Sequence, residues 1–273
     1  MKKQIINLNA LDAFRISARY NDVALGAPKE NPDSHIHDEC EIYINLSGDV
    51  SFMVENRIYP ILPGNIIITR PYEYHHCIYH SNKLHRHYWI LFSSKGNEEI
   101  LDIFFKRKAG EHNLLVLPVY NTEELISLCD RLCDNNENNQ IENYCIFFDI
   151  LKLLKKADKP TPVLETHPDD ITFSLDYINK NLSESFTVKE LAQKANVSLN
   201  TLERHFLKAL NTSPRNYIKK KRLANILRLL SLGDTVTDAC SKSGISDYSG
   251  FIKEFKSIYG ITPLKYQKQI QNK

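Results

Sequence analysis

Alternating apolar and polar residues dominate the first third of the chain. A period of two, interrupted every few positions by turn residues, is typical of short antiparallel strands. Five such segments occur between residues 41 and 92: EIYINL from Glu41, VSFMV from Val50, RIYPIL from Arg57, NIIIT from Asn65 and HYWILF from His87. Their spacing predicts an antiparallel β-barrel or sandwich over about residues 14–93.

The hydrophobic period then changes to that of helices. Residues 98–108, 123–132 and 144–154 carry apolar positions one helical turn apart. We expect amphipathic helices within about 98–156 that cover the barrel or pair with a second copy of the chain. Three prolines between residues 157 and 170 predict a linker. The expected organisation is an α+β chain of two domains: a sensing and dimerisation domain over 1–160, a linker over 161–170 and an all-helical domain over 171–273.

One short pattern occurs twice in the C-terminal third, about 48 residues apart. The first copy reads TVKELA from Thr187 and VSLNTL from Val197, and the second reads TVTDAC from Thr235 and ISDYSGF from Ile245. The offset grows from 48 to 49 partway through, so the second copy contains one inserted residue. Each copy closes with a capping residue and a proline, which is a favoured helix start: Ser213-Pro214 and Thr262-Pro263.

Each copy has the composition of a helix-turn-helix unit. Thr187, with Glu190 three residues on, forms a capping box that starts one short helix, and Thr235 starts its counterpart. After a tight turn, Ser198 and Ser246 are expected to cap a second helix that exposes polar side chains to a major groove. The side chains expected to contact bases are Asn200, Thr201, Glu203, Arg204, Tyr248, Ser249 and Lys253. Those expected to contact phosphates are Thr187, Ser198, Lys208, Lys219, Thr235, Ser246 and Lys256.

A basic helix is predicted between the two copies. From Pro214 to about Leu232 it would be about 28 Å long, which can hold two reading helices about one DNA turn apart, on the order of 34 Å. Residues 170–273 carry 17 Lys and Arg against 9 Asp and Glu, whereas residues 1–169 carry 18 against 24. The helical half is therefore attracted to phosphate, and we predict binding to double-stranded DNA.

These residues resemble the DNA-binding domain of AraC/XylS-type transcriptional regulators over about residues 171–268. The matching residues are Leu191-Ala192, Ser198, Leu202, Arg204 and Phe206 in the first copy, Arg222 and Leu229-Leu230 in the connecting helix, and Gly244, Ser246, Ser249, Phe251, Phe255-Lys256, Gly260, Thr262-Pro263 and Tyr266 in the second. The resemblance implies about seven helices, two helix-turn-helix units and recruitment of RNA polymerase at a promoter.

The sequence also departs from the pattern of that family. Gly250 stands inside the second reading helix and should weaken it by roughly 1 kcal/mol. The other departures are Ala239-Cys240, Ile245, Ile226, Asn211 and Gln267.

Seven of the ten histidines lie between residues 35 and 87. His35, His37 and Glu41, followed by six residues and Gly48, resemble the first cupin motif. In a strand, His35 and His37 would point to the same side and toward a barrel interior. The expected N-terminal fold is accordingly a cupin-like barrel with flanking helices.

The second cupin motif is degenerate, with Arg70 and Glu73 where cupins prefer Pro and Gly. His75 or His76 would complete the histidine set, and the spacing from Gly64 favours His75. We expect four further polar residues to lie on the solvent-facing side of a strand: His80, His85, Arg86 and His87. Tyr43 and Trp89 are expected to belong to the core.

Three interpretations of His35, His37, Glu41 and His75 stay open. Neutral imidazoles and a carboxylate are suitable ligands for a divalent metal. The same groups can bind the hydroxyls of a sugar-like effector. They can also be satisfied by ordinary hydrogen bonds within the protein.

The two halves together predict a cytoplasmic homodimer that binds promoter DNA and responds to a small-molecule effector, an activator of carbohydrate-related genes by its resemblance. We expect no catalytic residues and no cofactor other than the candidate metal. The N-terminus lacks an apolar signal core and no run of about 18 apolar residues occurs, so no membrane partner is expected. Two alternatives are a metal-dependent cupin enzyme fused to a DNA-binding domain and a constitutive regulator whose barrel only dimerises.

Overall fold

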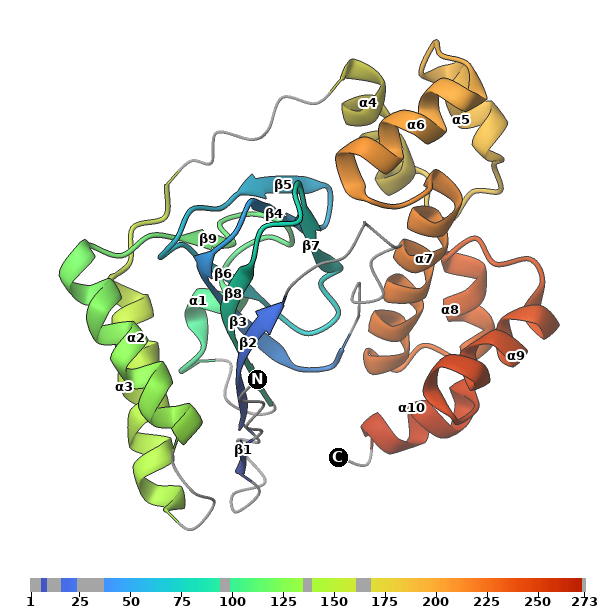
Figure 1. The fold of residues 1–273 in the computed structure, drawn as a ribbon. Helices are drawn as coiled ribbons and strands as arrows, with labels where there is room; N and C mark the ends of the chain where they lie inside the picture. The colour runs from blue at the N-terminus through green and yellow to red at the C-terminus, as the bar shows by residue number, and fades with distance from the viewer. Residues whose placement is uncertain are drawn as a thin grey trace. The chain divides into compact units, whose positions relative to one another are not determined.

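The computed structural model describes residues 6–8, 16–23, 37–93, 99–134, 139–160 and 168–271, and Figure 1 shows their helices and strands. The chain divides into two units, residues 1–165 and 166–273. All of the described strands belong to the first unit, and the described part of the second contains helices alone. The α+β class predicted from the hydrophobic periods is confirmed.

Two antiparallel sheets form the first unit, with six strands in the order β1-β2-β8-β3-β6-β9 and three in the order β5-β4-β7. Both sheets contribute to one apolar cluster, Tyr43 and Ile67 from the larger and Phe52 and Tyr59 from the smaller, so the sheets pack face to face. The strands are β1 Ile6–Leu8, β2 Ile16–Val23, β3 Cys40–Ser47, β4 Val50–Val54, β5 Arg57–Pro60, β6 Ile66–Thr69, β7 His75–Tyr79, β8 His85–Phe92 and β9 Leu114–Leu115.

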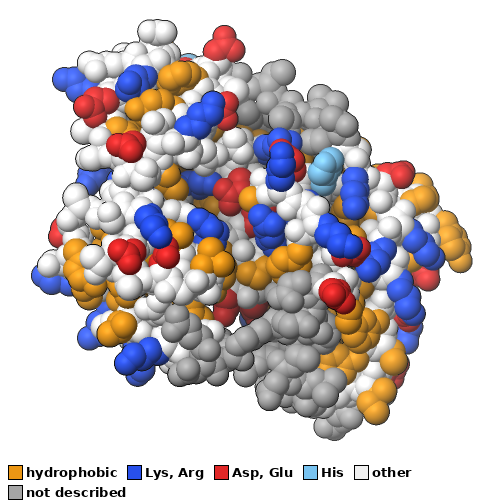
Figure 2. All heavy atoms as spheres, turned by 180° about the vertical axis from the view of Figure 1, so that it is seen from behind, with side chains coloured by type: hydrophobic (Ala, Val, Ile, Leu, Met, Phe, Trp, Pro, Cys, Tyr) orange, Lys and Arg blue, Asp and Glu red, His pale blue; other side chains and the backbone are white. Residues whose placement is uncertain are grey.

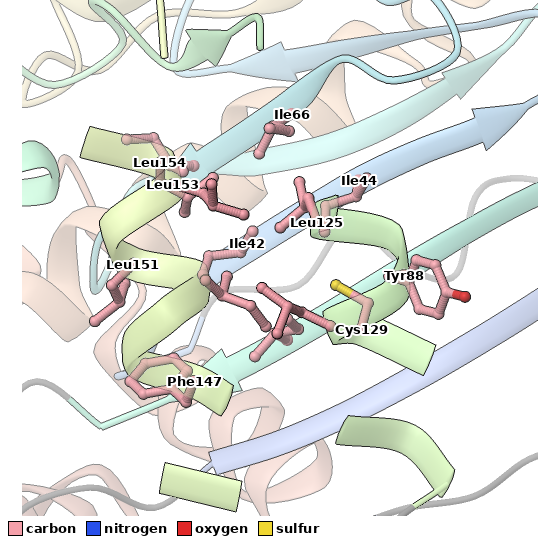
Figure 3. Packing of buried hydrophobic residues seen from close by; sticks show 14 of the residues in the cluster. Ile42, Ile44, Ile66, Tyr88, Leu125, Cys129, Phe147, Leu151, Leu153 and Leu154 are labelled. Carbon is pink, nitrogen blue, oxygen red and sulfur yellow. The ribbon is translucent and has the colours of Figure 1, made fainter. Parts of the chain in front are cut away.

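Two helices cover the outer face of the larger sheet. Side chains alternate along a strand, so Ile42 and Ile44 of β3 point away from the smaller sheet and lie in one buried cluster with Leu125 and Phe147 of the helices (Figure 3). Burying a large aliphatic side chain contributes roughly 1.5–3 kcal/mol. The helix expected over 98–108 is shorter than predicted. The three helices are α1 Asp102–Phe105, α2 Val119–Asp134 and α3 Gln140–Lys156.

Seven helices make up the described part of the second unit, as the resemblance implies. They are α4 Asp169–Lys180, α5 Val188–Lys194, α6 Leu199–Leu210, α7 Pro214–Ser231, α8 Val236–Lys242, α9 Tyr248–Tyr259 and α10 Pro263–Gln271. Across the described ranges of both units, no helix combines the length and the apolar character that crossing a membrane requires.

The repeated pattern of the sequence corresponds to repeated structure. Helices α5 and α8 start 48 residues apart, whereas α6 and α9 start 49 apart. The backbone N–H of Val197 donates to the carbonyl of Ala192, and that of Ile245 donates to Cys240 in the same way. The inserted residue is therefore Ser246, and Asp247 is the structural counterpart of Ser198.

Candidate nucleic-acid interface and barrel interior

Helix α6 has the two-sided character that a reading helix needs. The side chain of Ser198 caps it by accepting a hydrogen bond of 3.1 Å from the N–H of Thr201. Its buried face consists of Leu202, Phe206 and Leu210. The exposed residues on its other side are Asn200, Glu203, Arg204 and Lys208. Thr201 is half-buried, and its hydroxyl lies 2.8 Å from Ser198 Oγ, so it is engaged in the cap.

A buried contact fixes α6 against α4. His205 Nδ1 donates a hydrogen bond of 2.8 Å to Asp170 Oδ2, and Asp170 is buried. Helix α4 begins with Pro168 as its N-cap, without a side-chain hydrogen bond. Asp170 connects the first helix of the domain to its first reading helix.

Helix α9 repeats the plan with a different cap. Phe251 and Phe255 are buried, and Tyr248, Ser249 and Lys253 are exposed as predicted for base contacts. The predicted cap Ser246 is incorrect, because Asp247 holds that position. Ser246 is instead an exposed residue of the turn.

The residues predicted to contact phosphates differ in the bonds they form within the protein. Lys208 and Lys256 are exposed near the C-terminal ends of α6 and α9. Lys219 of α7 forms an ion pair of 2.7 Å with Glu254 of α9. Thr187 and Thr235 cap α5 and α8, where their hydroxyls accept hydrogen bonds from backbone N–H groups. In Figure 2, Lys and Arg side chains lie among acidic and hydrophobic ones over the visible face.

In the first unit, the structure brings together the imidazoles of His37 and His75 and the carboxylate of Glu41, and we call these three residues the carboxylate cluster. Nε2 of each imidazole lies 3.0 Å from Glu41 Oε2. One ligand atom from each residue lies within 4.8 Å of the others. His75 belongs to the cluster, and His76 does not. His35 lies outside the described residues.

The other ring nitrogens of the cluster fix its chemistry. His37 Nδ1 donates to the carbonyl of Glu39 at 3.0 Å, and His75 Nδ1 donates to that of Glu73 at 2.6 Å. Nε2 is therefore the atom that each ring directs at Glu41. Burial opposes the charge of Glu41, but the two imidazoles outweigh it and hold its pKa well below the usual value. His37 precedes β3 rather than lying in a strand, so the predicted strand geometry for it is wrong.

The degenerate second motif has a structural explanation. Glu73 is buried, and its carboxylate accepts hydrogen bonds from Arg107 Nη1 at 2.8 Å and from the N–H of Gly110 at 2.7 Å. Asn113 Nδ2 donates to it at 3.3 Å. Glu73 thus ties the loop after α1 to the strand that carries His75.

A second polar group faces the smaller sheet, and the sequence interpretation missed it. Strand register places Asn21 and Asn45 on either side of His87, and we call these three residues the polar row. The same strand pairings place Arg19 and Tyr43 on either side of Trp89 in the neighbouring row. The Arg19 guanidinium carbon lies 5.1 Å from the Trp89 ring centre.

The prediction that His85 and His87 lie on a wet face is wrong. Both are buried, and burial lowers the pKa of His85 to about 4 and that of His87 to about 3. His85 Nε2 is hydrogen-bonded to the Tyr43 hydroxyl, and His87 Nε2 lies 3.0 Å from Asn21 Nδ2. Arg86, between them, is on the exposed side as expected. These histidines are neutral hydrogen-bonding groups inside the protein.

Several atoms of this interior lack hydrogen-bond partners among the described residues. They include both amide atoms of Asn45, which is fully buried, together with His87 Nδ1 and Arg19 Nε. Leaving a buried polar group unpaired costs about 1–3 kcal/mol. Such groups beside aromatic rings suit a ligand that offers hydroxyls along with apolar C–H faces.

Comparison with known proteins matches both units. A model described as an AraC-like ligand binding domain matches residues 24–143, and a helix-turn-helix domain model matches residues 191–269. The transcriptional activator RhaS of Mannheimia succiniciproducens is 24% identical over 87% of this chain and 90% of its own. The lactose operon transcription activator of Staphylococcus xylosus is 23% identical over 90% of this chain and 89% of its own.

Solved structures give similar matches. The DNA-binding domain of AdpA in complex with a target DNA covers 38% of this chain and 96% of its own, with 23% identity and a TM-score of 0.37. ToxT from Vibrio cholerae covers 95% of this chain and 99% of its own, with 14% identity and a TM-score of 0.37.

Proposed function

The chain belongs to the AraC family of transcription regulators, and we propose that it activates promoters in response to a neutral, polyhydroxylated effector bound between its two sheets. The observation that carries the effector class is the fully buried side-chain amide of Asn45 in the polar row, which has no hydrogen-bond partner among the described residues. A hydroxyl both donates and accepts, so it can satisfy the amide and the free imidazole nitrogen together. Trp89, which is half-buried, offers an aromatic face to the apolar side of a sugar ring.

The similar proteins support this chemistry. Relatives include the lactose operon activator and a raffinose operon regulator of Pediococcus pentosaceus, the latter 28% identical over 46% of this chain. A sugar that binds the folded chain raises its stability, by about 2.7 kcal/mol at a hundredfold excess over Kd. A thermal-shift screen of neutral sugars and sugar acids therefore tests the proposal.

A pair of variants makes the screen specific. Asn45→Leu removes an amide with no described partner, so the free protein should keep its stability but lose the shift caused by sugar. Asn113→Leu is the control, because Asn113 Nδ2 donates to the Ile68 carbonyl at 2.8 Å and its loss should destabilise the free protein. An Asn45→Leu variant that responds to sugar like the parent would contradict the assignment.

On the DNA side, Asn200, Thr201, Glu203 and Arg204 of α6 would read bases in one major-groove segment. Tyr248, Ser249 and Lys253 of α9 would read the next. Lys208 and Lys256 would hold phosphates, and the hydroxyls of Thr187, Ser198, Thr235 and Ser246 with Lys219 would assist. The proposal includes a cytoplasmic homodimer, paired through α2 and α3, that recruits RNA polymerase. Footprinting of the full chain on DNA selected from a random pool tests it. Protection confined to one groove segment would contradict the pairing of α6 with α9.

The carboxylate cluster supports a second ligand, a divalent cation. Metal-bound histidines commonly donate their other ring nitrogen to a backbone carbonyl, as His37 and His75 do. With Glu41 they provide two nitrogens and an oxygen, which suits zinc or a related ion. Such an ion would crosslink the start of β3 to β7.

Metal content per chain, measured after incubation with zinc or manganese, tests the cation directly. Thermal unfolding with and without a chelator gives a second readout. Glu41→Gln should reduce both the bound metal and the response to chelator. Equal metal in the parent and in Glu41→Gln would reject the site.

A further inference from the structure

Arg222 of α7 joins the two helix-turn-helix units directly. Its Nη2 donates a hydrogen bond of 2.6 Å to the carbonyl of Glu184, in the segment that connects α4 to α5. Its guanidinium carbon lies 5.5 Å from the ring centre of Phe186 in the same segment. The side chain therefore contacts the segment before α5 at two points.

The same guanidinium lies against the turn of the second helix-turn-helix unit. Gly244, between α8 and α9, has a φ of +70°. A Cβ there would lie 3.0 Å from Arg222 Nη2 and 2.6 Å from the carbonyl oxygen of Leu182. Only glycine allows this approach, so the backbone between α4 and α5, Arg222 and the turn between α8 and α9 form one joint.

Two further polar contacts continue the joint along one side of α7. Lys219, one turn before Arg222, pairs with Glu254 of α9 at 2.7 Å. Asn225, one turn after it, donates a hydrogen bond of 3.0 Å from Nδ2 to the hydroxyl of buried Ser243. Residues three apart share a helix face, so all three face the second helix-turn-helix unit.

Apolar packing alone does not fix α9 in this position. A cavity of about 320 Å³ opens between α7 and α9, lined by Leu223, Ile226, Phe251, Phe255 and Ile258 among others. Ile258 on this lining is exposed, so apolar contact between the two helices is incomplete there. The polar contacts of α7 supplement it.

We propose that Arg222 is a positioning residue that sets the distance between the two DNA segments read by α6 and α9. This inference rests on the proposed reading roles of those helices. The guanidinium acts through its contacts with the protein. It decides which spacing of two half-sites a single chain can occupy, and Gly244 is needed to let it do so.

Half-site spacing tests the proposal with the full chain. A site is first selected from random DNA with the parent protein, and then one or two base pairs are added or removed between its halves. The parent should lose roughly tenfold or more in affinity on each change, as expected for a specific site placed out of register. Arg222→Ala should bind the altered spacings within about threefold of the original, while point changes inside each half-site keep their usual cost.

Three variants complete the experiment. Arg222→Lys, which can still reach the Glu184 carbonyl but cannot stack on Phe186 as a plane, should restore part of the spacing preference. Gly244→Ala should relax the preference as Arg222→Ala does, which provides an independent test if Arg222→Ala folds poorly. Arg215→Ala removes an exposed arginine from the same helix and should lower affinity equally at every spacing.

The outcomes separate the two proposals. If the parent selects no two-part site, the proposed DNA-reading roles fail. If the parent selects such a site and both Arg222→Ala and Gly244→Ala keep its full spacing preference, only the role of Arg222 is overturned.

Discussion

Asp247 and Gly250 define the start of the second reading helix. The Asp247 carboxylate accepts a hydrogen bond of 2.8 Å from the N–H of Gly250, and a Cβ at position 250 would lie 2.2 Å from Asp247 Oδ2. The glycine that looks like a weak point of the helix makes room for its cap. A good cap contributes about 1 kcal/mol, which offsets the helix propensity that glycine forfeits.

Gly250→Ala should therefore destabilise the protein, although alanine ordinarily gains about 1 kcal/mol over glycine inside a helix. The added methyl must displace the Asp247 carboxylate and break the cap. Chemical unfolding of the full chain measures the effect, with Ser249→Ala in the same turn as the control. A more stable Gly250→Ala variant would show that the cap has little weight.

Arg204 and Lys208 lie one turn apart on α6 and should behave differently on DNA. Arg204→Ala should reduce the discrimination between the selected site and random DNA by about 1–3 kcal/mol, because a base contact is lost. Lys208→Ala should weaken both kinds of binding alike and flatten the dependence of log Kd on log salt. Titrations at several salt concentrations distinguish the two results. Unchanged discrimination in Arg204→Ala would mean that α6 reads bases through other side chains.

Glu73 and Arg107 form a buried ion pair whose side chains are 0% and 5% exposed. Arg107→Met should cost about 3–5 kcal/mol of unfolding free energy, because it leaves a buried carboxylate without its counter-charge. Adding Glu73→Gln to that variant should recover much of the loss, since the amide oxygen can still accept from Gly110. Urea unfolding of the parent, the single variants and the double variant gives the coupling. Additive losses would contradict a strong interaction between the two residues.

Stability of the N-terminal unit should depend on pH through His85 and His87. Burial lowers the pKa of His85 from 6.5 to about 4 and that of His87 to about 3. Between those values and 6.5 the unfolded chain binds more protons than the folded one, so stability falls as the pH is lowered through this range. His87→Asn should make the fall shallower.

The carboxylate cluster acts in the opposite sense and must be separated from this effect. Burial disfavours the charged form of His75, but Glu41 outweighs it and raises the pKa of His75. The stability that His75 contributes is therefore present at low pH and lost as the pH rises through its raised value. The measurement is the difference in unfolding free energy between parent and variant at each pH. His112→Asn, at an exposed position, is the control, and an equal slope in His87→Asn would reject the role of His87.

Strand prediction succeeded where one face is apolar and failed where the inner face is polar. β4 coincides with a predicted segment, and β5 covers the first four residues of another. β2 was not predicted, since its inward positions are Ser17, Arg19 and Asn21. The side chains of β2 do alternate, but the set that faces the second sheet is polar rather than apolar.

The histidines of β8 were misassigned for a related reason. Tyr88, Ile90 and Phe92 pack against the helices, so the alternation alone predicts that the remaining residues of the strand face solvent. The second sheet covers that other side as well, and strand periodicity cannot reveal this cover. Periodicity gives the face of a residue but not what lies opposite, whereas the helix-turn-helix caps depend on local sequence and were mostly predictable.

The extra residue Ser246 has a consequence for how operators should be searched. It lengthens the second turn by one residue, and α9 exposes side chains that differ from those of α6. Two reading helices that differ in this way would favour different short base sequences. The DNA site bound by one chain would then be asymmetric, and the reversed sequence would be a different site. A genome search should look for asymmetric pairs of short words rather than for mirrored repeats.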